Sequence, residues 1–229
     1  MAAIFSVVIV GPGRLGRHVA EGLRCAGYPV TLVGKGEGIP PAAVTWFTVP
    51  DGAVAAASAA APAGCRLHSA GALEATVLGE RAAVLHPLMT FPPPAGARVF
   101  ATLDGEPEAC RLATVLASAL GWTVLGPVND RVRYHAAASL VSGHAGALFL
   151  DAVQLLTAST GMGEAAAAEA LLSLCHASLE NVAARGAEAI TGPAARGDLN
   201  TVEAHRSALP PSLLPVYDFL TERILALRG

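Results

Sequence analysis

The segment with the clearest chemical meaning is Gly11-Pro12-Gly13-Arg14-Leu15-Gly16, whose glycines follow the pattern GxGxxG. A continuous apolar run typical of a buried strand precedes it (residues 4–10), and a segment with helical apolar spacing follows it (residues 14–27). In that setting the first glycine permits a tight turn, the second admits a pyrophosphate to the backbone, and the third lets the helix pack on the strand. The helix N-terminus presents free N–H groups to phosphate. We predict that Gly11, Gly13, Arg14, Leu15 and Gly16 bind a dinucleotide; the alternative is a tight turn without a ligand.

The residues after the second expected strand (28–34) bear on which dinucleotide is bound. NAD-binding chains usually place an Asp or Glu there to accept hydrogen bonds from the ribose hydroxyls. Here Gly34 and Lys35 stand at that place, which leaves room for a 2′-phosphate and puts a cation beside it. We therefore expect Gly34 and Lys35 to contact the cofactor and NADP to be preferred, with NAD possible. The alternative is that Lys35 is a solvated turn residue.

Other candidate residues end predicted strands, at the edge of an open α/β sheet where ligands bind. Val49 and Pro50 follow one strand, and Ser69 and Gly71 follow another and would line the nicotinamide end of the cleft. His86 ends a further strand, where it either lines the site or has a structural role. The other histidines considered, His18, His68 and His176, are interpreted as structural.

A polar stripe marks the first long helix of the second half of the chain. Arg131, His135, Ser139 and Ser142 recur at spacings of four, four and three residues on an otherwise apolar helix. A stripe of this kind either faces solvent or faces the cleft, and we expect the cleft. We name His86, His135 and Ser139 as candidate catalytic residues, with either histidine as the proton donor to a reduced substrate.

A second concentration of polar side chains lies in TGPAARGDLNTVEAH (191–205), the most polar stretch of the chain. Arg196 is our fourth candidate for the catalytic site, because either Arg131 or Arg196 would hold a substrate carboxylate through two parallel hydrogen bonds. The alternative is a loop that satisfies its own hydrogen bonds and caps the next helix.

The elements that position these residues change character part-way along the chain. Short β-branched runs alternate with alanine-rich segments in the first half, which predicts a Rossmann-type, doubly wound, mostly parallel α/β sheet. The connection between the second and third strands is too short for a crossover helix. Strand signals end before residue 130, and helices are expected over 131–160, 164–186, 202–209 and 213–229. We predict a dinucleotide-binding domain over residues 1–128 and an all-helical substrate and dimerisation domain over residues 129–229.

Composition restricts the function further. The chain has 229 residues, of which 53% are hydrophobic and 14% charged, so it is long and apolar enough for a folded core. A net charge of −3 disfavours nucleic acid as a partner. No apolar run is read as a membrane span, and four scattered cysteines argue for reduced thiols, no metal site and a cytoplasmic protein. The apolar faces expected in the helical half, with Leu148, Phe149, Leu155 and Leu156 among them, predict a homodimer.

Taken together, the segments VGPGRLG, TVPD, HSAGAL, LHPLMTF, RYHAAA, ITGPAARGD and TVEAH resemble the family that joins a Rossmann-like domain to a C-terminal DUF2520 domain. More distantly the chain is similar to pyrroline-5-carboxylate reductase, ketopantoate reductase and 6-phosphogluconate dehydrogenase-like enzymes. The resemblance implies an NAD(P)-dependent oxidoreductase, with a small 2-oxo acid such as ketopantoate, or an imine, as substrate. It also implies that the 191–198 loop returns to the cofactor cleft, of the same subunit or of its partner, where Arg196 would contact an anion.

Two departures from the family pattern lie on the first long helix. Arg131 stands where the family often has lysine, and Ser142-Gly143-His144 replaces an element that contains asparagine. The rival interpretations are a dinucleotide-binding redox sensor or scaffold without catalysis, and a deazaflavin-dependent NADP reductase that shares the glycine motif. A second polar wall, made by the helix stripe and the 191–205 loop, favours an enzyme that reduces a small, anionic substrate.

Overall fold

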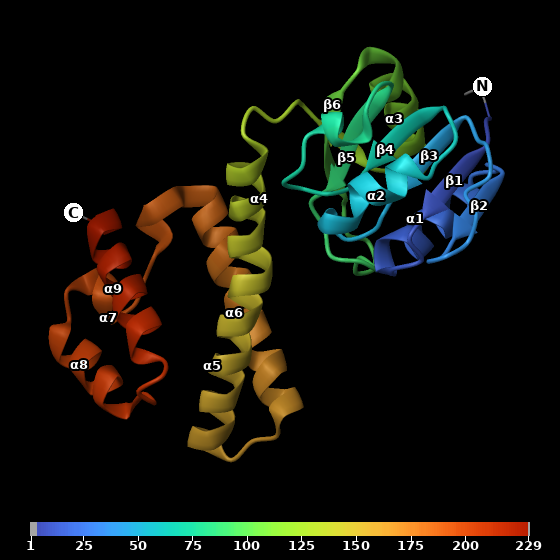
Figure 1. Cartoon of the computed structure of the whole chain (residues 1–229). Coiled ribbons are helices and arrows are strands. Elements are labelled where there is room, and N and C mark those ends of the chain that lie inside the picture. The colour runs from blue at the N-terminus through green and yellow to red at the C-terminus, as the bar shows by residue number, and fades with distance from the viewer. Residues whose placement is uncertain (1–3, 229) are drawn as a thin grey trace. The chain divides into compact units, whose positions relative to one another are not determined.

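The computed structural model describes residues 4–228 (Figure 1). Within them, one sheet has seven strands in the order β2-β1-β3-β4-β5-β6-β7. All neighbouring strands are parallel except β5 and β6, which pair antiparallel. The predicted α/β class and mostly parallel sheet are confirmed. The strands are β1 (Val7–Val10), β2 (Val30–Val33), β3 (Val44–Phe47), β4 (Cys65–His68), β5 (Ala82–Pro87), β6 (Phe100–Gly105) and β7 (Thr123–Leu125).

Helices cover both faces of the sheet because alternate strand residues point to opposite sides. One layer of the core joins Ile9 and Trp46 to α1 (Arg14–Cys25) and α3 (Pro107–Ala119). The other layer joins Val10 and Phe47 to α2 (Val54–Ala59) and the short helix η2 (Ala75–Leu78). Both layers contain fully buried aliphatic and aromatic side chains, so the strands are held between two apolar layers.

The carboxyl ends of β1 to β5 meet at one edge of this sheet, and the connections there carry the candidate site. The connection from β2 to β3 contains no helix among its residues, which are all described, as its length and Pro40-Pro41 predict. In the sheet β1 lies between β2 and β3, so the chain leaves β1 and β2 in opposite directions across the sheet. A crevice beside such a reversal of strand order is where open α/β sheets bind ligands.

The remaining chain is helical, as predicted. Asp130 caps the first of these helices by accepting a hydrogen bond from the Arg133 amide at 2.9 Å. The predicted single helix over 131–160 contains a π-helical turn, η3 (Leu140–His144), between α4 (Arg131–Ser139) and α5 (Ala145–Thr160). The elements that follow are α6 (Glu164–Arg185), η4 (Gly186–Ala189), α7 (Pro193–Arg196), α8 (Leu199–Ala208) and α9 (Leu214–Arg228).

The chain divides into two compact units, Met1–His144 and Ala145–Gly229. This division falls later than residue 128, where the change in sequence texture places the predicted boundary. The difference has a structural reason: α4 belongs to the α/β unit, since Arg131, Tyr134 and His135 all contact residues of its strands or strand ends. The helical unit is built from α5 packed on α6, and from α7 in contact with α8 and α9.

The continuous helix over Arg131–Thr160 is long and apolar enough, by length and composition alone, to cross a membrane, and only 6% of its apolar window is buried. This corrects the sequence interpretation that no run reaches that length, because the alanine residues between the larger apolar side chains keep the average hydropathy high. The amino-terminal end of the same helix packs against the rest of the α/β unit, since the Arg131 side chain is fully buried.

Candidate functional site

The glycine loop between β1 and α1 is held in shape by Thr48, the first residue after β3. The Thr48 hydroxyl lies 2.8 Å from the carbonyl oxygen of Gly11, to which it donates, and its amide donates to Val10. Gly11 has a φ of 109°, which favours glycine, and a Cβ there would lie 2.9 Å from the Thr48 carbonyl group. A Cβ on Gly16 would collide with the Gly11 carbonyl group. These two glycines are therefore required for the turn itself.

Gly13 has a different environment, which bears on whether a dinucleotide fits. A Cβ added at Gly13 would meet no atom within 4 Å, so the space above its backbone is open. No side chain caps the N-terminus of α1, which begins directly after Gly13 and has no acidic residue in its first turn. Free N–H groups and the positive end of the helix dipole thus face an open space, as a pyrophosphate requires. The residues present fit the predicted cofactor.

A cavity of about 310 Å³ opens beside this loop. It joins residues of the glycine loop to Ser69 after β4 and to the end of β5 and the segment that follows it. The Ser69 hydroxyl is already engaged, because it accepts from the Trp46 indole and donates to the Leu85 carbonyl, both at 2.8 Å. The cavity is lined by Arg14, Leu15, Ser69, His86, Pro87, Met89, Thr90 and Phe91.

His86 is the histidine of this cavity wall, and its hydrogen-bonding state is set by α4. The Tyr134 hydroxyl lies 2.6 Å from His86 Nδ1 and accepts from Thr102 Oγ1 at 3.2 Å. Because the Tyr134 hydroxyl accepts from Thr102, we infer that its own O–H donates to His86 Nδ1. A neutral imidazole with an acceptor at Nδ1 carries its proton on Nε2. His86 thus presents an N–H donor on its other side.

Burial is the main reason that this imidazole is neutral. It lowers the pKa of His86 from 6.5 to about 4, and the electrostatic effects of His135 and Arg131 act in the same direction. The rings of His86 and His135 pack edge-to-face with centroids 5.8 Å apart. Gly71 makes this possible: a Cβ there would lie 2.8 Å from His86 Nε2 and 2.6 Å from His135 Cδ2. The two histidines converge over a residue without a side chain.

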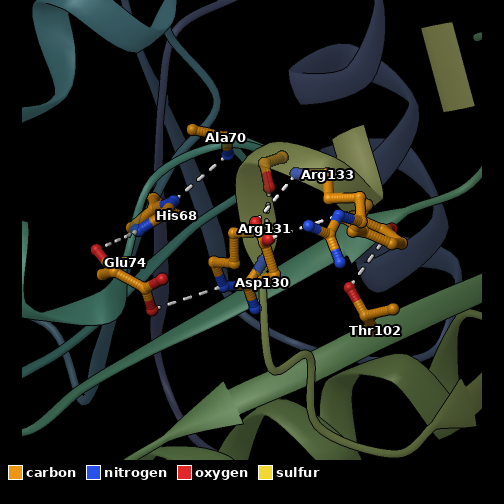
Figure 2. A network of polar contacts seen from close by, with 9 residues as sticks. His68, Ala70, Glu74, Thr102, Asp130, Arg131 and Arg133 are labelled. Atoms are coloured by element: carbon orange, nitrogen blue, oxygen red, sulfur yellow. Dashed lines mark hydrogen bonds and ion pairs between the residues drawn. The ribbon is translucent and has the colours of Figure 1, made fainter. Parts of the chain in front are cut away.

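Arg131 is 1% exposed, and Figure 2 shows its side chain beside Glu74. Its Nη1 lies 3.5 Å from the Gly71 carbonyl oxygen, and its Nε lies 3.8 Å from a carboxylate oxygen of Glu74, whose side chain is 61% exposed. Nε and Nη2 have no hydrogen-bond partner among the described residues. Burial lowers the pKa of the guanidinium, and the charges of Asp104 and Glu74 oppose that effect. Because the side chain is enclosed, Arg131 is not positioned to hold a substrate carboxylate itself.

His68 has the structural role that the sequence suggests. Its Nδ1 accepts from the Ala70 amide and its Nε2 donates to the Glu74 carbonyl, both at 3.1 Å, as Figure 2 shows. Burial lowers the pKa of His68, so the ring is neutral. These bonds shape the loop after β4, which carries Gly71 and also Glu74, the ion-pair partner of Arg131.

The turn after β2 differs from the sequence interpretation in one respect. Gly34 and Lys35 stand there as expected, but the carboxylate of Glu37 returns to the strand end and accepts from the Gly34 amide at 2.6 Å. Lys35 has no ion pair among the residues that the structure describes. A carboxylate therefore occupies the end of β2, although the residues directly after the strand include none.

In and next to the polar stretch 191–205, several polar groups are bonded to residues of the same helical unit. Asp198 caps α8 by accepting from both the amide and the hydroxyl of Thr201, at 3.1 and 2.6 Å, and these bonds lower the pKa of Asp198. His205 Nδ1 lies 2.9 Å from the Tyr217 hydroxyl. Hydrogen bonds to Asp218 and Glu203 raise the pKa of Arg206. In contrast, the Arg196 side chain is exposed and forms no ion pair within the described residues.

A family model described as a domain of unknown function, DUF2520, matches residues 99–224, which is more than half of the chain. The chain belongs to the DUF2520 family. No curated protein matches the sequence. The predicted family resemblance is confirmed.

Solved structures show that this DUF2520 chain has a known two-part fold. A Thermotoga maritima protein is 21% identical with a TM-score of 0.74, over 97% of this chain and 98% of the other. A Bacteroides fragilis protein proposed to be an NADP oxidoreductase is 19% identical with a TM-score of 0.81, over 97% and 98%. A reductive aminase from Aspergillus terreus in complex with NADPH and ethyl levulinate is 20% identical with a TM-score of 0.71, over 98% and 94%. At these identities the likeness establishes the fold.

The structure of this DUF2520 protein brings most of the predicted site residues to one sheet edge. The cofactor candidates Gly11, Gly13, Arg14, Leu15, Gly16, Gly34, Lys35, Val49, Pro50, Ser69 and Gly71 all follow carboxyl ends of strands, and His86 and His135 meet there. Ser139 lies about one helical turn beyond His135, where its carbonyl oxygen is bonded by His144. Arg196 belongs to the helical unit.

Sequence reasoning missed the residues that orient the site, which are Thr48, Tyr134, Thr102 and Glu37. Tyr134 directly precedes a named candidate, and Thr48 precedes Val49, so the candidate motifs already contained two of them. Nothing in the sequence pattern singled out Thr102, because its partner lies on another element.

Proposed function

We propose that this protein is an NADP-dependent reductase of a small carbonyl or imine substrate that carries a carboxylate, such as a 2-oxo acid. The observation that supports this most directly is that one cavity is lined both by the glycine loop and by a neutral histidine. Arg14 and Leu15 of the glycine loop, where a dinucleotide would bind, line the same cavity as His86. A hydride donor and a hydrogen-bond donor would thus face the same substrate.

The bound cofactor would supply the hydride, and this chain would supply position and electrostatic stabilisation. Reduction of a carbonyl substrate would place negative charge on its oxygen. Reduction of an imine would leave an electron pair on its nitrogen that takes up a proton. The Nε2–H group of His86 would donate to that atom, and a donor fixed before the reaction need not reorganise. Tyr134 and Thr102 hold the ring in the tautomer that has this proton on Nε2. His135, packed on the same ring, is the second candidate for delivering a proton.

The experiment is a turnover assay over small 2-oxo acids, with and without ammonium or a primary amine, that follows consumption of NADPH. His86→Ala is expected to lower kcat by about 100- to 1,000-fold, as expected for loss of one donor to a developing oxyanion. His86→Gln should retain part of the activity because its amide nitrogen can take the place of Nε2. Nucleotide affinity, measured by calorimetry, should change little in either variant.

Tyr134→Phe provides the second arm, because it removes the hydroxyl that fixes the tautomer and leaves the ring in place. We expect kcat to fall by about tenfold while KM is nearly unchanged, since the donor would be mispositioned only part of the time. If the wild type binds NADPH yet consumes none with any substrate of the panel, the dinucleotide-binding module without catalysis becomes the better description.

We further propose that the helical unit pairs with a second copy of this chain. Among its described residues the buried apolar side chains are Val153, Ala167, Ala194 and Val202, while large apolar side chains on α5, α6 and α9 are exposed. Leu150, Leu174, Leu179 and Phe219 are each more than 60% exposed. An apolar surface of this extent is typical of an obligate interface.

Light scattering at micromolar concentration is expected to give twice the chain mass, and Leu174→Glu with Leu179→Glu should shift the mass to that of one chain. A monomeric wild type would contradict the proposal. Recovery of the protein only in detergent would instead assign the exposed apolar helix to a membrane.

A further inference from the structure

We propose that Glu37 is the residue that sets the balance between NADPH and NADH, by holding its carboxylate at the place where the 2′-group of the adenosine ribose would lie. The inference rests on the proposed function, because it concerns the cofactor of the same site. It adds a residue that the strand-end rule does not name, since Glu37 lies three positions beyond Gly34 in the chain and returns to it in space.

The turn after β2 is built so that Glu37 can reach back. The Glu37 amide donates to the Gly34 carbonyl at 3.4 Å, which closes a tight turn, and Gly36 within it has a φ of 84° that favours glycine. The carboxylate then accepts from the Gly34 amide at 2.6 Å. A Cβ added at Gly34 would be in ordinary van der Waals contact with that carboxylate oxygen, at 3.4 Å, so Glu37 packs directly against the strand end.

The Gly34 amide is the first backbone donor beyond the carboxyl end of β2, the strand whose end meets the adenosine ribose in dinucleotide-binding folds. A ribose 2′-hydroxyl would donate to a carboxylate placed there and would leave the Glu37–Gly34 bond intact. A 2′-phosphate is an anion, so it would be repelled by Glu37 and would have to displace it to reach the same amide. Binding of NADPH thus carries a cost at this corner that NADH avoids.

Lys35 acts in the opposite direction at the same corner. It is exposed, stands next to Gly34, and forms no ion pair with Glu37 in the described part of the chain. Its ammonium is therefore available to a 2′-phosphate, whereas a 2′-hydroxyl gains little from it. The net preference between NADPH and NADH would be the difference between these two contributions.

The test measures binding of NADPH and NADH by calorimetry, beside 2′,5′-ADP and 5′-ADP, which contain the adenosine half alone. Glu37→Gln keeps the side-chain length and an oxygen that can accept from Gly34 but removes the charge. We expect it to raise the affinity for NADPH and 2′,5′-ADP by about tenfold and to leave that for 5′-ADP nearly unchanged. Lys35→Ala should lower the affinity for the 2′-phosphorylated ligands by a similar factor, and both changes should shrink in high salt.

Glu80→Gln is the matched control, because it removes an exposed carboxylate beside the amino end of β5, at the opposite edge of the sheet. It should leave all four affinities unchanged. Failure of the wild type to bind any of the four ligands would overturn the proposed function together with this inference. If the ligands bind but Glu37→Gln leaves the ratio of NADPH to NADH affinity unchanged, only the role of Glu37 is overturned.

Discussion

Two regions of this protein concentrate polar side chains, and they differ in how completely those groups are satisfied. Along α8 and α9, Asp198, His205 and Arg206 each bond to a neighbour in the same unit and lie at or near the surface. Around α4, Arg131 is enclosed and keeps two nitrogen atoms without a hydrogen-bond partner in the described structure. Buried polar groups in folded proteins are nearly all paired, so the second arrangement calls for a reason other than stability.

The difference separates polar groups that hold the fold from polar groups that serve a site. A satisfied surface cluster stabilises the ends of helices and can be altered at small cost. Enclosure of the second region instead lowers the pKa of His86, mainly through burial, and the Arg131 cation acts in the same direction. Perturbed titration of this kind within a cavity wall is typical of functional sites. Variants in the two regions should therefore affect different observables.

The largest effect is expected from Gly71→Ala, because the new methyl group would push apart His86 and His135. Turnover should fall by more than about 100-fold, since a misplacement of about 1 Å is enough for such a loss. The free energy of unfolding should fall by about 1–3 kcal/mol from overpacking. Gly146→Ala, at a helical position with nothing within 4 Å of the added Cβ, is the control and should affect neither quantity adversely. Near-normal turnover in Gly71→Ala would show that the two rings do not act together.

The second prediction concerns pH. The pKa of His86 is about 4 in the folded protein and near 6.5 when unfolded, so between these values the unfolded chain binds more protons. Stability is fully present above pH 6.5 and is lost as the pH falls toward 4, by at most about 3 kcal/mol for this group. His68 contributes in the same direction because its pKa is also lowered. Denaturant titrations at several pH values from 7 to 4 give the free energy of unfolding, which should fall less steeply with falling pH in His86→Gln than in the wild type. The same fall in both proteins would contradict the lowered pKa of His86.

The third prediction concerns Arg196, which lies in the helical unit among polar side chains that are bonded to their neighbours. If Arg196 holds a substrate carboxylate, Arg196→Ala should lower kcat/KM by about tenfold or more through loss of a charge-assisted hydrogen bond. Nucleotide affinity by calorimetry should stay the same. The control is Arg223→Ala, an exposed arginine of α9 in the same unit. Equal kcat/KM values for the two variants would place Arg196 with its structural neighbours.

The smallest effects are expected from two helix caps, one in each region. Asp130 caps α4 and Asp198 caps α8, each by accepting a hydrogen bond from an amide three residues on. Alanine at either position should lower the Tm by a few degrees. Only Asp130→Ala should also lower turnover, because α4 carries Tyr134 and His135. Loss of turnover in Asp198→Ala would mean that the helical unit communicates with the site.

The sequence predicted the features that depend on local pattern. Continuous apolar runs predicted β1, β3 and β5, and the glycine spacing predicted the loop that precedes α1, because each of these signals lies within a few consecutive residues. The antiparallel pairing of β6 was missed, since a strand pattern does not reveal direction. The π-turn at Leu140–His144 was missed because it shifts the hydrogen bonds by one residue without a change in composition.

The orienting contacts of the site were missed for a related reason. Tyr134 and His86 are 48 residues apart and meet only because α4 packs against the end of β5. Glu37 was overlooked because the strand-end rule examines residues in chain order, whereas its carboxylate returns through a tight turn. Such contacts depend on the assembled fold, so they become visible only when the strand ends are placed side by side.

The position of the tryptophans gives this protein a built-in optical reporter. The chain has only two, Trp46 and Trp122, and both lie in the α/β unit with ring centroids 6.0 Å apart. Trp46 bonds to Ser69, and Trp122 packs against Phe91 at 5.9 Å, and both of these neighbours line the cavity. Emission from the indoles therefore reports on the cavity wall without an attached dye, and a reduced nicotinamide there would quench it by energy transfer. Since the helical unit has no tryptophan, the same emission follows melting of the α/β unit alone.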